Sequence, residues 1–298
     1  MTAILQRFII FAERILKTTF QTMITFPCCK INLGLNIVAK RPDGYHDLET
    51  VFYPVPLTDK LEATVGNGAD GTCSLSLSGN PIEGNAADNL IVKAYNLLAT
   101  DHRLPHVDFD LEKHIPSQAG LGGGSSDATY TLRLLNELCQ LHLDSPTLQR
   151  YAAQLGADCA FFVTAEPSFA TGIGDILTPM ADECAHLKGL YLLIVKPSVA
   201  ISTAQAFSFV KPQPPIIRCK EVVAQPIDEW RDRLGNDFEV SIFNIHPEIR
   251  SVKQQLYSMG ATYAQMSGSG SAFFGIFNEA PTRLPEAFDG MFTYLCQL

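Results

Sequence analysis

A glycine-rich segment between a strand pattern and a helix pattern constrains the fold of this chain more than any other feature. The segment covers residues 116–127 and reads PSQAGLGGGSSD. Before it, Val107, Phe109 and Leu111 alternate with acidic residues, which is typical of a half-buried strand. After it, apolar residues recur at helical spacing from Ala128 onward. The sequence therefore predicts a strand, a glycine loop and the N-terminus of a helix in direct succession.

Such a succession of elements favours the binding of phosphate groups. The first N–H groups of a helix lack partners within the helix, and the helix dipole places partial positive charge there. Glycines let the backbone approach oxygen atoms closely. The segment is not a P-loop, because the chain has no Gly-Lys pair, and Ser125 stands where the dinucleotide motif needs its third glycine. We predict that residues 116–126 bind the phosphates of a nucleotide, with the hydroxyls of Ser125 and Ser126 as further donors or a metal ligand.

The composition excludes several classes of protein. The chain has 298 residues, with 22 Lys and Arg against 31 Asp and Glu, so its net charge is −9. An acidic chain lacks the basic surface that nucleic-acid binding needs. No apolar run reaches the roughly 18 residues that span a membrane. None of the eight cysteines forms a CxxC pair, which indicates reduced thiols. We expect a cytoplasmic, globular protein with no nucleic-acid or membrane partner.

Two charged residues stand in apolar surroundings elsewhere in the chain. Lys30 begins the alternating run KINLGLNI, which predicts a strand. Lys30 and Asn32 would share one face of it, and four aliphatic residues would share the other, namely Ile31, Leu33, Leu35 and Ile37. Asp158 lies in the apolar segment 157–162, where an ionised carboxylate needs a partner. Lys30 is the candidate partner, and an ordinary helix-capping aspartate is the alternative.

The order of predicted elements indicates an α+β protein of two domains. A second glycine loop, SGSGS at 267–271, separates two predicted strands in the second half of the chain. We predict an N-terminal extension at residues 1–22, a first domain at 23–175 and a second domain at 176–298.

Three motifs in this order resemble the small-molecule kinase superfamily named for galactokinase, homoserine kinase, mevalonate kinase and phosphomevalonate kinase (the GHMP kinases). They are CKINLGL at 29–35, GLGGGSSD at 120–127 and MSGSGS at 266–271. Within this superfamily, the hairpin KRPDGYHDLET at 40–50 and the segment LGADCAFF at 155–162 are similar to the family of 4-diphosphocytidyl-2-C-methyl-D-erythritol kinases, which act in the non-mevalonate route to isoprenoid precursors.

The resemblance implies a fold and an activity. The expected fold joins an N-terminal domain like domain 2 of ribosomal protein S5 to a ferredoxin-like C-terminal domain. The expected reaction is the ATP-dependent phosphorylation of the 2-hydroxyl group of the methylerythritol unit, with Mg²⁺ accompanying ATP. The expected partners are therefore ATP and a small cytidyl diphosphate substrate.

The resemblance also implies roles for individual residues. Asp158 matches the catalytic aspartate, as a base or an orienting group, and Lys30 matches the lysine that is its charge partner. Tyr45 and Phe207 would stack on the two faces of the cytosine. The expected substrate-binding residues are Asn32, Tyr45, His46, Thr203 and Phe207. The expected ATP-binding residues are Pro116, Ser117, Gln118, Ala119, Gly120, Leu121, Gly122, Gly123, Gly124, Ser125 and Ser126.

Two other functions stay open. A sister kinase that acts on homoserine, mevalonate or a sugar would share both glycine loops and Asp158, so only the hairpin at 40–50 separates it from the expected enzyme. A nucleotide-binding module without catalytic activity would not need both Lys30 and Asp158. The residues predict neither the Mg²⁺ ligands nor the oligomeric state.

Overall fold

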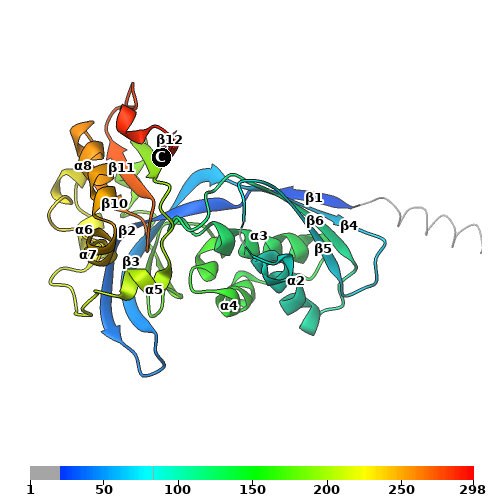
Figure 1. Ribbon diagram of the computed structural model, residues 1–298. Helices are drawn as coiled ribbons and strands as arrows, with labels where there is room; N and C mark the ends of the chain where they lie inside the picture. Colours follow the sequence, from blue (N-terminus) through cyan, green and yellow to red (C-terminus); the bar gives the residue numbers. More distant parts are fainter. Residues whose placement is uncertain (1–20, 83) are drawn as a thin grey trace, which may run out of the picture.

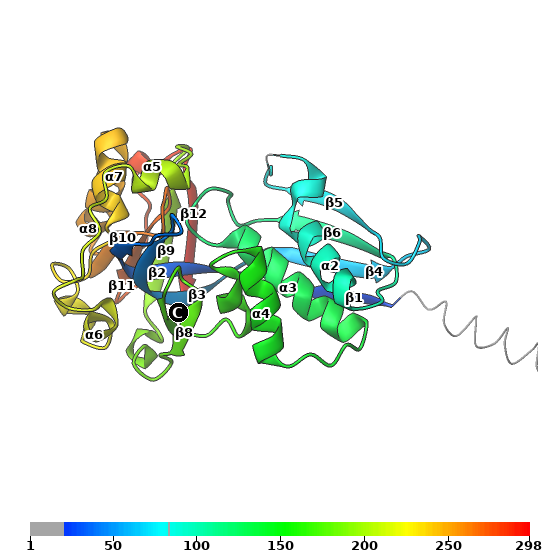
Figure 2. The same ribbon diagram turned by 90° about the horizontal axis from the view of Figure 1, so that it is seen from below.

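The computed structural model describes residues 21–82 and 84–298. The predicted N-terminal extension lies outside the described residues, except for its last two positions. Figures 1 and 2 show an elongated molecule with two lobes, joined by the long strands β2 (Cys28–Lys40) and β3 (His46–Thr58). Within the described part of the chain, no helix is long and apolar enough to cross a membrane.

The first lobe contains a four-stranded sheet in the order β1-β4-β6-β5. Strands β5 and β6 are parallel, and the other pairs are antiparallel. Three helices cover one face of this sheet (Figure 1). These strands are β1 (Thr22–Thr25), β4 (Lys60–Val65), β5 (Cys73–Gly79) and β6 (Val107–Lys113), and the helices are α2 (Leu90–Asp101), α3 (Gly123–Leu138) and α4 (Ser145–Leu155). The predicted strand before the glycine loop is confirmed as β6, whose apolar residues are buried and whose aspartates are exposed.

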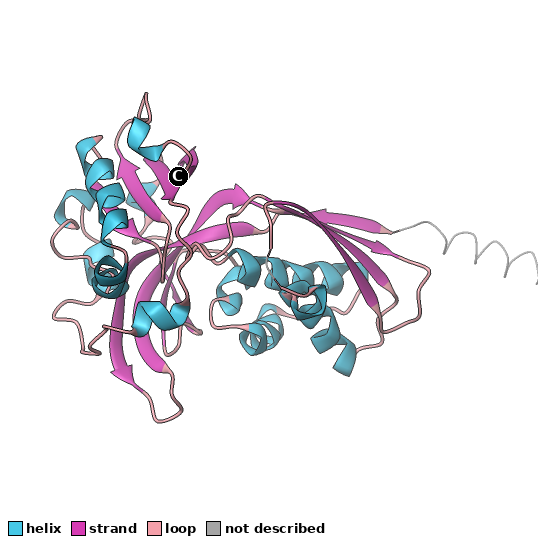
Figure 3. Ribbon diagram, in the orientation of Figure 1, coloured by secondary structure: helices cyan, strands magenta, loops and turns pink. Residues whose placement is uncertain are grey.

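The second lobe contains an antiparallel sheet in the order β10-β11-β9-β12. Its strands are β9 (Tyr191–Lys196), β10 (Tyr263–Met266), β11 (Phe273–Phe277) and β12 (Phe292–Gln297). Helix α8 packs on β10 and β11, and Figure 3 shows most helices of this lobe at its outer side, whereas α5 lies on the side that faces the first lobe. The helices are α5 (Thr203–Phe207), α6 (Cys219–Val223), α7 (Phe238–Ile245) and α8 (Arg250–Ser258). The two strands predicted around the second glycine loop are confirmed as β10 and β11.

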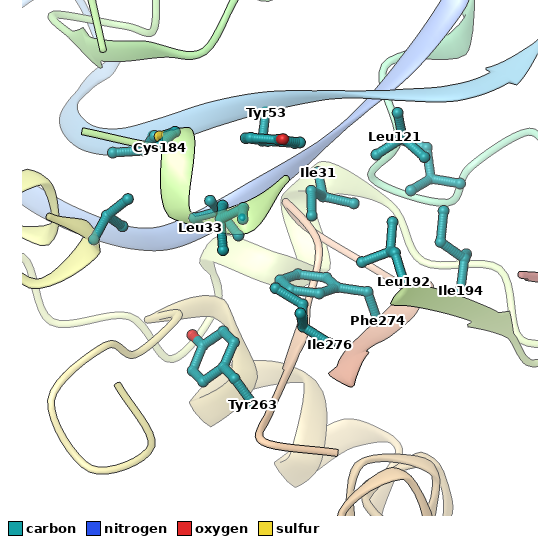
Figure 4. Close-up of a cluster of buried hydrophobic side chains, with 14 of the residues drawn as sticks. Ile31, Leu33, Tyr53, Leu121, Cys184, Leu192, Ile194, Tyr263, Phe274 and Ile276 are labelled. Carbon is teal, nitrogen blue, oxygen red and sulfur yellow. The ribbon is translucent and has the colours of Figure 1, made fainter. Parts of the chain in front are cut away.

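A third sheet, in the order β2-β3-β7-β8, connects the lobes. It adds β7 (Ser168–Thr171) and β8 (Ile176–Pro179), which pair with each other. The predicted domain boundary after residue 175 falls in the turn between them, and it stays a prediction. Side chains of β2 such as Ile31 and Leu33 pack against Leu192 and Phe274 of the second lobe in one buried cluster (Figure 4). The remaining short elements are 3-10 helices, η1 (Ala86–Asp88), η2 (Cys159–Val163), η3 (Ala185–Leu187), η4 (Ile227–Glu229), η5 (Pro247–Ile249) and η6 (Glu286–Phe288).

The alternation predicted along β2 is wrong beyond Leu33. Leu33 pairs with Val51 but Leu35 pairs with Thr50, so Gly34 is an extra residue that forms a β-bulge. Gly34 has φ +71°, and a Cβ there would lie 2.5 Å from Leu234 Cδ1. Because the bulge shifts the side-chain period by one residue, Leu35 lies on the same face as Asn32 rather than on that of Leu33.

Candidate active site

Two cavities meet at the first glycine loop. One, of about 500 Å³, is lined by residues 116–125 and by the loop before α2. The other, of about 600 Å³, is lined by the β2–β3 hairpin, α5 and the second glycine loop. The cavities share four lining residues, namely Gly120, Gly122, Ser125 and Thr203. A ligand held on the loop in the first cavity therefore lies next to whatever occupies the second.

Helix α3 begins inside the glycine loop. Gly122 is its N-cap, at φ +72°, and the first helical residue is Gly123. The N–H groups of residues 123–125 precede the first hydrogen bond of the helix, which Ser126 N–H donates to the Gly122 carbonyl. The predicted strand, loop and helix N-terminus are therefore confirmed, and this end of α3 faces the first cavity.

The structure places Ser126, one of the predicted ATP-binding residues, outside the lining of both cavities. Its N–H is used within the helix, as above, and its side chain is fully buried away from both cavities. The reason is helical periodicity: α3 starts earlier than the sequence indicated, so Ser125 and Ser126 point in different directions. Ser125 lines both cavities, as do the loop glycines Gly120 and Gly122.

Lys30 and Asp158 lie together in the second cavity. Lys30 Nζ is 3.2 Å from Asp158 Oδ2, and it donates hydrogen bonds to Asn32 Oδ1 at 2.7 Å and to the Gly120 carbonyl at 3.0 Å. The Lys30 side chain is 3% exposed, whereas that of Asp158 is 33% exposed. Asp158 precedes η2 but makes no side-chain capping hydrogen bond to it, so the alternative of an ordinary capping aspartate is excluded. The predicted pair is present, and Asp158 is its accessible member.

The second glycine loop, residues 267–271, contacts both Asn32 and the first glycine loop. Ser267 Oγ donates to the Gly120 carbonyl at 2.9 Å, the same oxygen that Lys30 contacts, and it accepts the Asn32 N–H at 3.3 Å. Asn236 Nδ2 in turn donates to the carbonyls of Met266 and Gly268. In the sequence this loop was one of the three motifs that resemble the GHMP kinases, and nothing there indicated that Ser267 joins the two loops.

The second cavity is also lined by the predicted aromatic residues. Tyr45 is 62% exposed at the end of the β2–β3 turn, and the structure also places His46, Phe207 and Thr203 in the lining. The ring that stacks on Phe207 is that of His46, at a centroid distance of 4.5 Å and an interplanar angle of 21°. Phe238 packs against Phe207 in a T-shaped arrangement, with the ring centroids 4.8 Å apart. In this structure, therefore, His46 rather than Tyr45 faces Phe207.

Sequence reasoning missed a buried ion bridge beneath the glycine loop. Lys113 Nζ donates to Asp127 Oδ2 at 2.7 Å and to Asp59 Oδ2, and all three side chains are 4% exposed or less. Lys113 and Asp127 also line the first cavity. The strand pattern carried a signal for this bridge, because Lys113 continues the buried series Val107, Phe109 and Leu111 by strict alternation.

The bridge predicts a dependence of stability on pH. Burial raises the pKa of Asp127 to about 7, and the charge of Asp59 adds to this effect, whereas Lys113 opposes it. A carboxyl group whose pKa is higher in the folded state than in the unfolded state contributes stability at low pH, and this contribution is lost as the pH rises. We therefore expect the Tm of the wild-type protein to fall relative to that of Asp127→Asn between pH 5 and pH 8. Parallel Tm profiles for the two proteins over this range would contradict the expectation.

Comparison with known proteins agrees with this geometry. The family model for the GHMP kinases N terminal domain matches residues 89–166, and the model for the GHMP kinases C terminal domain matches residues 220–289. A Bacteroides fragilis protein named 4-diphosphocytidyl-2-C-methyl-D-erythritol kinase is 52% identical over 276 residues, which cover 93% of this chain and 100% of that relative. The chain belongs to the 4-diphosphocytidyl-2-C-methyl-D-erythritol kinase family.

Solved structures agree with membership of the 4-diphosphocytidyl-2-C-methyl-D-erythritol kinase family. A crystal structure of a 4-(cytidine 5'-diphospho)-2C-methyl-D-erythritol kinase matches with a TM-score of 0.70 and 31% identity, covering 85% of this chain and 90% of the other. The Methanococcus jannaschii mevalonate kinase matches with a TM-score of 0.66 at 11% identity, covering 93% and 98%, which shows a shared fold alone. The predicted α+β, two-domain GHMP kinase fold is therefore confirmed.

Proposed function

We propose that this chain transfers the γ-phosphoryl group of ATP to the 2-hydroxyl group of 4-diphosphocytidyl-2-C-methyl-D-erythritol. The observation that carries the proposal is the Lys30–Asp158 pair, which lies where a phosphate-binding loop separates two cavities. One cavity has the features of a nucleotide site, and the other has room and polar groups for an acceptor. The family relationship supports the identity of that acceptor.

The first cavity would hold the triphosphate. Phosphate oxygens are stabilised at a helix N-terminus by N–H groups and by the dipole, and residues 122–125 place the start of α3 there. Mg²⁺ prefers oxygen ligands from phosphates together with one or two protein groups. The Ser125 hydroxyl lines both cavities at the start of α3, so it fits as a protein ligand of such an ion, which would neutralise charge on the phosphates.

Asp158 and Lys30 would act on the acceptor hydroxyl. Phosphoryl transfer depends on positioning and on charge stabilisation more than on covalent chemistry by the protein. Asp158 is exposed to the cavity and would accept or orient the hydroxyl proton. Lys30 would offset the negative charge of the carboxylate and of the transferred group, while its hydrogen bonds to Asn32 and Gly120 keep the ammonium in place.

The cytosine would bind at the other end of the second cavity, against the hairpin residues Tyr45 and His46. Aromatic side chains stack favourably on planar rings. The His46 ring covers one face of Phe207 in this structure, so a cytosine that stacks on that face requires His46 to move aside. Asn32 lines the same cavity and accepts a hydrogen bond from Lys30, and there it would position the erythritol hydroxyls.

An ADP-release assay tests the proposed function directly. The protein is incubated with ATP, Mg²⁺ and the cytidyl acceptor, and phosphorus NMR of the product then identifies the new phosphomonoester. We expect ADP and product in equal amounts. Turnover of mevalonate or homoserine without turnover of the cytidyl acceptor would contradict the proposal.

Replacing Tyr45 with Ala is expected to affect acceptor binding selectively. Loss of the exposed ring should raise the KM for the cytidyl substrate by about 10-fold, which is the scale of one aromatic stacking contact. The KM for ATP should change by less than about 2-fold, because Tyr45 does not line the first cavity. Tyr45→Phe, which keeps the ring, is the matched control and should retain the KM for the acceptor. An equal rise for ATP in the Ala variant would contradict the stacking role.

A further inference from the structure

The ion bridge of Asp59, Lys113 and Asp127 contacts both ends of the first glycine loop. Asp59 Oδ1 accepts the N–H groups of His114 at 2.6 Å and of Ile115 at 2.8 Å, the two residues directly before Pro116. Asp127 lies in α3, directly after the loop. Because Lys113 donates to both carboxylates, its ammonium group connects the residues before the loop with the helix after it.

Between these ends, Ala119 and Leu121 pack into the hydrophobic core, but the four glycines of the loop have no side chain that could define its conformation. Gly120 and Gly122 have positive φ angles, and Gln118 has φ +50°. Glycine-rich backbone has many accessible conformations, so it loses more conformational entropy than other backbone when it becomes ordered. A loop that becomes ordered only when its ligand binds weakens the binding by that cost.

We propose that Lys113 is a positioning residue for the nucleotide: through Asp59 and Asp127 it holds both ends of the glycine loop in the conformation that binds phosphate. The inference rests on the proposed function for the identity of the ligand as ATP. Lys113 acts here through the two carboxylates, and it has no part in the transfer itself.

Two substitutions of Asp127 separate this role from a contribution to stability alone. Asp127→Ala removes the link between Lys113 and α3. Asp127→Asn keeps an oxygen that accepts a hydrogen bond from Lys113, and it also leaves the Lys113–Asp59 contact intact. Both variants remove the same charge, so they differ in the link and not in the net charge of the bridge.

The experiment measures KM for ATP, KM for the cytidyl acceptor and kcat in the full-length chain, at a temperature where circular dichroism shows each variant folded. We expect Asp127→Ala to raise the KM for ATP by about 10-fold, the scale of one hydrogen bond to a charged group. The KM for the acceptor should change by less than about 2-fold, and Asp127→Asn should restore the KM for ATP to within about 3-fold of wild type.

Other outcomes overturn the inference. A lower Tm for Asp127→Ala with an unchanged KM for ATP would show that the bridge only stabilises the fold. Equal increases in the KM for ATP in the Ala and Asn variants would show that the link itself is not what matters. If Asp127→Ala is unfolded, Asp127→Ser, whose short hydroxyl cannot span the distance to Lys113, takes its place with the same expectations. Turnover of the wild-type protein is measured in parallel, so failure of the proposed function is recognised separately.

Discussion

Asp158→Asn is expected to lower kcat by about 100- to 10,000-fold, the range that a positioned acid or base contributes. Asparagine has nearly the same shape as aspartate but cannot accept the hydroxyl proton as a carboxylate does. Lys30 keeps its hydrogen bonds to Asn32 and Gly120, so the structure around it should persist. The dissociation constant of ATP, measured by calorimetry, should change by less than about 3-fold.

An exposed aspartate supplies the control for this variant. Asp182 is exposed in the segment after β8 and lines neither cavity, so Asp182→Asn should keep the kcat of the wild-type protein. Full activity of Asp158→Asn would remove Asp158 from the proposed mechanism. Loss of ATP binding in Asp158→Asn would instead assign the carboxylate to the nucleotide.

Among substitutions that add one methyl group in the site, Gly120→Ala is expected to be the most damaging. Gly120 has φ +71°, and a Cβ there would lie 1.9 Å from the carbonyl oxygen of Ser267. The left-handed backbone costs about 1–2 kcal/mol for alanine. Separating two loops that are packed backbone to backbone adds to this cost, so we expect the Tm to fall by about 5–10 °C. The Gly120 carbonyl would also move away from Lys30, so kcat/KM should fall by about 100-fold or more.

The same loop contains a matched control. A Cβ on Gly124 would meet no atom closer than Leu90 Cδ1 at 3.7 Å, and Gly124 lies within helix α3. Alanine is a better helix former than glycine by about 1 kcal/mol, so Gly124→Ala should keep or raise the Tm. Differential scanning fluorimetry compares the two variants. Equal Tm values would show that the contact between the two glycine loops does not constrain residue 120.

Local features of this protein could be predicted well from its sequence. The strand before the glycine loop, the loop itself and the helix after it were all expected from residues 107–138 alone. Period-two alternation and helical spacing depend on neighbouring residues, so they survive in any tertiary context that buries one face. The family resemblance depended in the same way on short contiguous motifs, and it led to the right fold and enzyme family.

Local patterns predicted the wrong side-chain directions where one residue shifted the periodicity of a strand or a helix. The bulge at Gly34 turned Leu35 to the face of Asn32, although aliphatic residues alternate with other residues without interruption in this part of the sequence. In α3, an earlier helix start turned Ser126 inward and left Ser125 in the cavity. Both shifts depend on backbone angles that glycine permits but does not require, so the sequence pattern alone does not reveal them.

The sequence by itself determined which chemical groups the protein has for phosphoryl transfer. These are a glycine loop before a helix, a lysine on an apolar strand and a carboxylate in an apolar segment. Only the tertiary structure decided which of these groups meet. Lys30 contacts Asp158 across 128 positions of the chain, Ser267 contacts the Gly120 carbonyl across 147, and Lys113 joins Asp59 to Asp127. Such contacts form because buried charges and hydrogen-bonding groups must find partners once the core excludes water, and the partner is set by the packing of sheets and helices rather than by neighbouring residues.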